Sequence, residues 1–214
     1  MYVNALMRDL DRECSVQSVE SISSIFIGGG TPSLFSGNAI NALLDGISNR
    51  LTLTDDVEIT LEANPGSADA SRFKHYKTAG VNRISIGIQS FSNACLTALG
   101  RAHNAVDSCD ALDAAVGAGF DNMNIDLMFG LPSEDSSRTL KDLSQAISFN
   151  PQHISWYQLT IEENTAFAKK PPMLPSHDEI CDEYEAGQIL LTEAGFSQYE
   201  ISAYSKQGSE SRHN

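Results

Sequence analysis

Residues 24–33 read S-I-F-I-G-G-G-T-P-S, an apolar run that meets three consecutive glycines and then Thr31 and Pro32. The apolar run predicts a buried strand, and the glycines predict a sharp turn at its carboxyl end. Because glycine has no Cβ, the N–H and C=O groups of such a turn can approach a ligand closely. A glycine triplet also occurs in simple strand-to-helix turns, so its meaning depends on the rest of the chain.

Further strands are predicted to begin near residues 57, 84, 123 and 154, with helical patterns between them. Together with the strand at residue 25 they recur about every 30 residues, which is the length of one strand–helix unit in a parallel sheet. The chain opens on an amphipathic helix in which Val3, Leu6, Met7 and Leu10 share one face. The sequence therefore predicts an α/β fold, either a β/α barrel or an open parallel sheet.

The pattern changes after the fifth strand, where residues 169–172 read K-K-P-P. Ser176 and Glu179 then have the spacing of a capping box for a helix that ends near Gly195, and a short strand is expected over residues 199–204. We therefore predict two parts, a barrel-like part over residues 1–168 and the start of a C-terminal extension, a helix plus a short strand, over residues 169–214.

The composition excludes several classes of partner. The 214 residues carry a formal net charge of -14, which argues against general binding to nucleic acid or to an anionic membrane. No uncharged apolar run approaches the roughly 20 residues of a membrane span, and Arg8 and Asp9 make the first ten residues unlike a signal peptide. We therefore expect a cytoplasmic protein with no obvious membrane segment.

Polar residues stand at the carboxyl end of every predicted strand, where parallel sheets and β/α barrels bind their ligands. These residues are Gly28 to Thr31, Glu62, Gln89, Asp126 and Thr160. A carboxylate accepts hydrogen bonds from both hydroxyls of a ribose, and a glutamine offers a donor and an acceptor together. Arg101 can pair with a carboxylate through two hydrogen bonds. Singly, Glu62 and Asp126 are equally well explained as helix caps or ion-pair partners, but together the residues favour one pocket.

Six motifs follow one another in order: G-G-G-T-P, E-A-N-P-G, R-I-S-I-G-I-Q-S-F, L-G-R-A-H, D-L-M-F-G-L-P and H-I-S-W-Y-Q-L-T-I-E. Over nearly its whole length the chain resembles the radical S-adenosylmethionine (SAM) proteins of the oxygen-independent coproporphyrinogen III oxidase family, and within it the haem chaperones. This resemblance implies a (β/α)6-type barrel, SAM and a [4Fe-4S] cluster as cofactors, and haem as a further ligand. In such proteins the cluster reduces the sulfonium of SAM and releases a 5'-deoxyadenosyl radical.

The resemblance also implies a role for each site residue. Gly29, Gly30 and Thr31 would face the amino end of the methionine, and Arg101 its carboxylate. Glu62 and Asp126 would hold the ribose hydroxyls, and Gln89 would add a polar contact. Met128 and Thr160 would flank the adenine. No residue of the chain is predicted to be catalytic or to bind metal.

The chain departs from the family at the cluster. No C-x-x-x-C-x-x-C motif is present, because Cys14, Cys95, Cys109 and Cys181 are separated by 81, 14 and 72 positions. In the family the cysteine loop follows a first strand that precedes the opening helix. The last residues, Arg212, His213 and Asn214, resemble the start of the H-N-x-x-Y-W motif of the haem chaperones. We therefore expect a partial barrel that lacks its first strand and cluster loop, as in an internal fragment of a longer protein.

Three functions remain open at this point. The first is a haem chaperone that in its complete form binds SAM, a cluster and haem, and passes haem or another porphyrin to an apoprotein. The second is an enzyme, the oxygen-independent decarboxylation of coproporphyrinogen III. The third is a SAM-like ligand binder without radical chemistry. Of the five histidines, His213 is the candidate haem contact, whereas His103 and His153 are expected to be structural.

Overall fold

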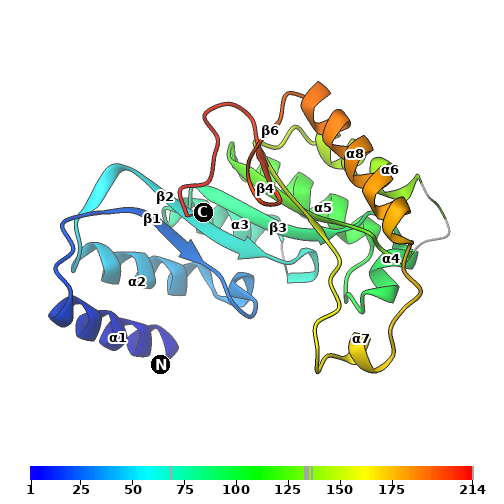
Figure 1. Ribbon diagram of the computed structural model, residues 1–214. Coiled ribbons are helices and arrows are strands. Elements are labelled where there is room, and N and C mark those ends of the chain that lie inside the picture. The colour runs from blue at the N-terminus through cyan, green and yellow to red at the C-terminus, as the bar shows by residue number, and fades with distance from the viewer. Residues whose placement is uncertain (68, 133–134, 136, 214) are drawn as a thin grey trace.

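The computed structural model describes residues 1–67, 69–132, 135 and 137–213, and it has one curled, half-barrel sheet flanked by helices (Figure 1). The strands lie in the order β1-β2-β3-β4-β5-β7-β6. Their bounds are β1 Ile22–Ile27, β2 Leu53–Ala63, β3 Arg83–Gln89, β4 Met123–Phe129, β5 His153–Gln158, β6 Ser197–Glu200 and β7 Ala203–Ser205. The α-helices are α1 Tyr2–Val16, α2 Gly37–Ser48, α3 Ala70–Thr78, α4 Asn93–Ala98, α5 Ala105–Gly117, α6 Arg138–Ser148, α7 Ala166–Lys169 and α8 His177–Glu193. Two 3₁₀ turns, η1 Pro32–Leu34 and η2 Pro65–Ser67, follow β1 and β2.

The mixed α/β class and the five predicted strands are confirmed. Strands β1 to β5 pair in parallel and in sequence order, with helices on the connections between them. The capping box at Ser176 and Glu179 is present at the start of α8. Parallel neighbours need such crossover connections, which is why the sequence repeats at this spacing.

The prediction of one short strand over residues 199–204 is wrong. The segment forms two strands, β6 and β7, which pair antiparallel with each other, and β7 also pairs antiparallel with β5. Ser202 has a φ of 60° and lies in the tight connection that reverses the chain. The separation into two parts at residue 168 stays a prediction, although β6 and β7 lie in the same sheet as β1 to β5. Asn214 lies outside the described residues.

The two faces of the sheet differ in chemistry. Residues that alternate along β3 to β5 pack under the helices and are fully buried, among them Ile86, Leu127 and Trp156. The opposite face, which β2 and β7 extend, carries polar side chains that are also buried: Thr60, Arg83, Ser85, Asn124, His153 and Ser205. Since side chains alternate between faces, both sets follow from one strand pattern. The second face is therefore a buried polar interior, and the candidate site lies where this face meets the carboxyl ends of the parallel strands.

The single tryptophan is part of the core, as expected. Trp156 is 1% exposed, and its ring lies 5.7 Å from the ring of Tyr184 on α8 in a stacked arrangement. Helix α8 approaches this ring at Gly187, where an added Cβ would lie 2.1 Å from Trp156 Cη2. A glycine at this position is thus required by the packing of α8 on the sheet.

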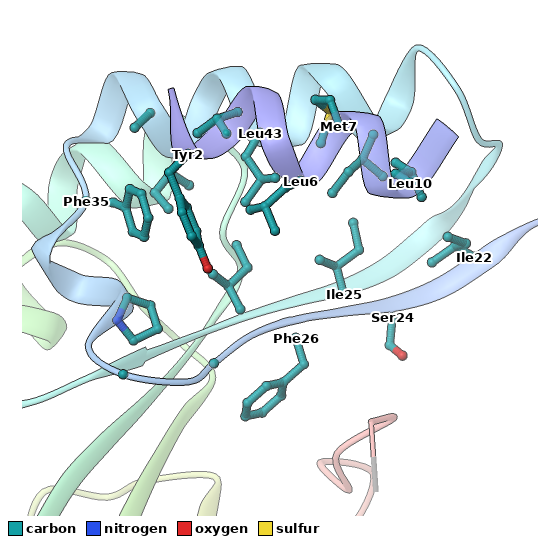
Figure 2. A pocket seen from close by; sticks show the side chains of 18 of the residues that line it. Tyr2, Leu6, Met7, Leu10, Ile22, Ser24, Ile25, Phe26, Phe35 and Leu43 are labelled. Atoms are coloured by element: carbon teal, nitrogen blue, oxygen red, sulfur yellow. The ribbon is translucent and has the colours of Figure 1, made fainter. Parts of the chain in front are cut away.

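Strand β1 forms one edge of the sheet, and helices α1 and α2 lie over it. Residues of α1, α2 and β1 line an apolar groove of about 620 Å³, among them Leu6, Leu10 and Leu43. Figure 2 shows Ile25 pointing toward these helices, whereas Ser24 and Phe26 point to the opposite face. The alternation of β1 therefore continues the apolar and polar faces of the central strands.

The last described residues return across the polar face to β1 and β2 (Figure 1). Arg212 forms an ion pair with Asp56 at 2.6 Å, and its backbone N–H donates to Glu58 Oε1 at 3.0 Å. The ring of His213 stacks on the ring of Phe26, with 4.3 Å between the centroids. The C-terminal segment is thus held at the sheet by contacts with side chains roughly 150 residues earlier in the chain.

Among the described residues, no helix combines the length and the apolar composition that crossing a membrane requires.

Candidate functional site

The glycine turn after β1 lies beside Glu62 of β2. The backbone N–H of Gly29 donates to Glu62 Oε2 at 3.2 Å. Gly28 allows this approach, because a Cβ there would lie 2.9 Å from Phe26 Cε1 and 3.1 Å from Glu62 Cδ. Gly29 has a φ of 112°, a conformation that side chains rarely adopt. The backbone of the turn is therefore in direct contact with the carboxylate of Glu62.

Gly30 and Thr31 continue the rim of this turn. Gly30 is exposed, and a Cβ added to it would meet nothing within 4 Å. The hydroxyl of Thr31 donates to the carbonyl of Gly30 at 2.8 Å. The turn thus offers open space on its outer side, as a ligand-facing loop requires.

Arg101 lies between the ends of β2 and β3. One of its terminal nitrogens, Nη2, donates to Asn64 Oδ1 at 2.8 Å and to the carbonyl of Gly87 at 3.3 Å. A Cβ on Gly87 would lie 3.5 Å from this nitrogen and 2.9 Å from Gln89 Nε2. Both acceptors are neutral, so these contacts leave the positive charge of Arg101 available to an anion. Asn64 is a site residue that the sequence analysis missed.

Gln89 ends β3 in an unusual conformation. Its φ is 64°, and the pairing of β3 with β4 slips by one residue between Gly87 and Gln89. The side chain is 7% exposed, yet its Oε1 has no hydrogen-bond partner among the described residues. Such strain and such an unsatisfied acceptor are concentrated at ligand sites.

Asp142 on α6 holds the turn that follows Gln89. Its carboxylate accepts from the Ser90 hydroxyl at 2.5 Å and from the Phe91 N–H at 3.0 Å.

Asp126 lies on β4, opposite Gly87 in the register of the sheet. Asn124 Nδ2 donates to its Oδ1 at 2.6 Å, and the hydroxyl of Ser85 lies 3.5 Å from both of its oxygens. Burial raises the pKa of Asp126 to about 6, a rise that Glu62 increases and that Arg83 and the hydrogen bonds oppose. A carboxylate kept partly dehydrated in this way favours a ligand that donates hydrogen bonds to it.

Tyr157 of β5 is a second residue that the sequence analysis missed. Burial raises the pKa of its hydroxyl, and the charge of Asp126 adds to the rise, whereas Gln89 and Arg101 oppose it. Tyr157 therefore lies among the three predicted site residues. Its alternation with buried Trp156 was the available signal, because it places Tyr157 on the polar face.

Met128 and Thr160 lie further from this group. Met128 is half-buried and packs on a small apolar cluster formed by Cys95, Leu131 and Leu159. Thr160 is exposed beyond the end of β5, and its hydroxyl donates to Glu162 Oε1 at 3.2 Å. Their predicted contact with an adenine ring stays a prediction.

The side chains present fit an adenosyl amino acid. Gln89 Oε1 is a buried acceptor with no hydrogen-bond donor within the described part of the chain, and Gly28 and Gly87 keep open a cradle that a Cβ would fill. Around them stand two carboxylates for hydroxyl groups and one guanidinium for a carboxylate.

The same residues do not fit a [4Fe-4S] cluster. The structure has Cys95 buried, Cys14 and Cys109 half-buried and Cys181 exposed, and none of the described residues form a group of three or more His, Cys, Asp or Glu able to hold a metal. Such clusters are held by several cysteines close together, which the described residues do not provide.

Comparisons with known proteins identify the family of the chain. Residues 6–144 match the Radical SAM superfamily. The chain is 52% identical over 213 residues to the "Heme chaperone HemW" of Escherichia coli K12, and it is 37% identical over 215 residues to the mouse "Radical S-adenosyl methionine domain-containing protein 1, mitochondrial". These alignments cover 100% and 99% of this chain but 56% and 49% of the relatives, so the chain spans about half the length of the curated proteins it matches.

A solved structure shows the same fold. The coproporphyrinogen III oxidase HemN of Escherichia coli, described as a radical SAM enzyme, superposes with a TM-score of 0.85 over 97% of this chain and 48% of its own. The two sequences are 23% identical, so the likeness concerns the fold alone.

Proposed function

Because the chain belongs to the Radical SAM superfamily, we propose that it binds SAM at the carboxyl ends of β1 to β5 and acts as a haem chaperone. The observation that carries the proposal of SAM binding is the convergence of Glu62, Gln89, Arg101 and Asp126 beside the glycine turn. The superfamily implies SAM and a [4Fe-4S] cluster. Haem handling rests on the relatives, which are named haem chaperones.

Each residue has a chemical reason for its proposed role. Arg101, whose described hydrogen bonds go to neutral oxygens, would hold the methionine carboxylate. The backbone of Gly29, Gly30 and Thr31 would face the amino group, and the carboxylates of Glu62 and Asp126 would accept from the ribose hydroxyls. Gln89 Oε1, for which the described residues supply no donor, would accept a hydrogen bond from the ligand, and Met128 and Thr160 would flank the adenine. Bound there, SAM would supply a sulfonium centre and an adenosyl group.

We expect the chain to bind SAM with a micromolar dissociation constant in isothermal titration calorimetry, a weak affinity because no cluster contributes. Replacing Glu62 by Gln should weaken binding roughly 10-fold or more, since a charge-assisted hydrogen bond contributes about 1.5–3 kcal/mol. Glu163→Gln, on an exposed residue after β5, is the matched control and should leave the affinity unchanged. Equal affinities for all three proteins would contradict the site.

The haem part of the proposal has its own test. His213 is exposed and stacked on Phe26, so its imidazole can serve as an axial ligand for haem iron. Titration with haemin should shift the haem absorption band, and His213→Ala should weaken binding at least several-fold, whereas His177→Ala, at an exposed position at the start of α8, should not. Transfer of the bound haem to a haem-free globin would support the chaperone role. A wild-type chain that leaves the haem spectrum unchanged would refute haem handling without touching the SAM site.

A further inference from the structure

A line of hydrogen bonds runs through the polar interior from β6 to Asp126. The hydroxyl of Tyr199 lies 2.7 Å from His153 Nε2, and His153 Nδ1 lies 2.6 Å from Asn124 Oδ1. Asn124 Nδ2 in turn lies 2.6 Å from Asp126 Oδ1. The four residues come from β6, β5 and β4, so three strands contribute to one line.

The direction of every hydrogen bond in this line is determined by its last member. An ionised Asp126 only accepts, so the amide of Asn124 must turn its NH2 toward it and its Oδ1 toward His153. His153 must then carry its proton on Nδ1. Burial, with a further contribution from Arg83, lowers the pKa of His153 to about 3, so the ring is neutral and its Nε2 accepts from Tyr199. Each donor therefore points toward Asp126, an arrangement in which hydrogen bonds strengthen one another.

The remaining capacity of Asn124 is also used. Its Oδ1 accepts a second hydrogen bond from the Ser155 hydroxyl at 3.1 Å, and its Nδ2 donates a second one to Ser85 Oγ at 2.8 Å. Asn124 is 2% exposed and His153 is 1% exposed. A buried amide with four good partners has one orientation, and it loses that orientation when a donor to its oxygen is removed.

The sheet contains a local device that brings Tyr199 to this place. The pairing of β6 with β7 slips between Gln198 and Glu200, which makes Tyr199 the extra residue of a β-bulge. Bulges re-aim side chains, and here the ring reaches past β7 to pack against His153 edge-on, with 5.5 Å between centroids. The same hydroxyl accepts from the backbone N–H of Ser211 at 3.1 Å, so the returning C-terminal segment contacts the start of the line.

We propose that Tyr199 and His153 are positioning residues, which fix the amide of Asn124 so that Asp126 presents both oxygens to the ribose of the bound nucleoside. The inference rests on the proposed function for its purpose, though not for its geometry. The charged and titratable groups that face Asp126 are Glu62 from β2, Arg83 from β3 and Tyr157 from β5. None of them changes in the variants below, so an altered pKa of Asp126 reports on the amide of Asn124.

Two substitutions of His153 separate positioning from packing. In His153→Asn the new Nδ2 takes the place of the ring Nδ1 and can still donate to Asn124. In His153→Gln the new amide reaches toward Tyr199, and the donor to Asn124 is lost. Both variants delete part of a buried ring and should lose similar stability. The readout is the pKa of Asp126 in the 214-residue chain, from the carboxyl ¹³C shifts of labelled aspartate, assigned with Asp126→Asn.

We expect His153→Gln to raise the proton affinity of Asp126 about 10-fold, because a freed amide also turns its oxygen toward the carboxylate. His153→Asn should leave the proton affinity within about 3-fold of the wild type. Tyr199→Phe should have an intermediate effect, and Tyr204→Phe, which changes a buried tyrosine of β7 on the opposite face of the sheet, should have none. SAM affinity should fall in the same order.

Equal pKa values for Asp126 in the Asn and Gln variants of His153 would overturn the proposal, whether or not they differ from the wild-type value. The carboxyl measurement needs no ligand. If the pKa values follow the expected order and the wild type does not bind SAM, the positioning line stands and the proposed function fails.

Discussion

Replacing Gly187 by alanine should destabilise the protein by roughly 3 kcal/mol, the range seen when a well-packed core is overfilled. The new Cβ would lie 2.1 Å from Trp156 Cη2 and 2.6 Å from Cζ2, and the ring also packs against Phe129 of β4, Tyr204 of β7 and Tyr184 of α8 itself. A rigid, fully buried indole cannot turn away, so α8 must shift. Since Trp156 is the single tryptophan, urea unfolding followed by its fluorescence measures the effect directly.

Gly117→Ala is the matched control for this substitution. Gly117 ends α5, is exposed, and has nothing within 4 Å of an added Cβ. Alanine is the better helix former by about 1 kcal/mol, so this variant should be as stable as the wild type or more so. A Gly187→Ala protein that unfolds at the same urea concentration as Gly117→Ala would show that α8 does not press on Trp156 as described.

Replacing Asp126 by asparagine should change stability and binding in opposite directions. The pKa of Asp126 is raised from 3.8 to about 6, so the folded state binds the proton more tightly than the unfolded state. The stability that this carboxyl contributes is therefore present below pH 3.8 and is lost as the pH rises through 6. Asparagine removes the cost of the buried charge and should add about 1–3 kcal/mol at pH 8, after allowance for partial exposure.

The same variant should bind SAM at least about 10-fold more weakly, because the ribose loses a charged acceptor. Urea titrations of both proteins at pH 8, 6 and 4.5 give the stability difference, which should shrink toward zero as the pH falls. His153, whose pKa is lowered to about 3, contributes stability with the opposite dependence on pH, but it is present in both proteins and drops out of the difference between them. An Asp126→Asn protein that is less stable at pH 8 than at pH 4.5, relative to wild type, would refute the assigned pKa.

The sequence predicted the central strands because their apolar residues alternate or run together, and because glycine or proline turns follow β1, β2 and β4. Ile84, Ile86 and Ile88 alternate with polar residues, and the glycines at 28–30 mark where β1 stops. The candidate site was predictable for the same reason, because side chains at the ends of parallel strands meet at one edge. Arg101 was found through the motif L-G-R-A-H, because it does not stand at the end of a predicted strand.

The polar interior was not predictable in this way. Whether His153 faces Asn124 depends on the register between β4 and β5, and one residue of slip would turn every side chain to the other face. Tyr199 was read as part of a single strand, so the bulge that turns it inward was invisible. Asn64 and Tyr157 were passed over because each lies beside a residue with a stronger signal, Glu62 and Trp156.

The hairpin of β6 and β7 also has a consequence for biosynthesis. Tyr199 is 46 residues after His153, so β4 and β5 leave the ribosome well before their hydrogen-bond partner. Until the hairpin docks, an imidazole and an amide lie in the interior with unsatisfied groups, and the nascent sheet has a second open edge beside β5. Strands made after the parallel ones thus complete this part of the interior, and nascent chains halted before residue 199 should be the preferred targets of chaperones and proteases.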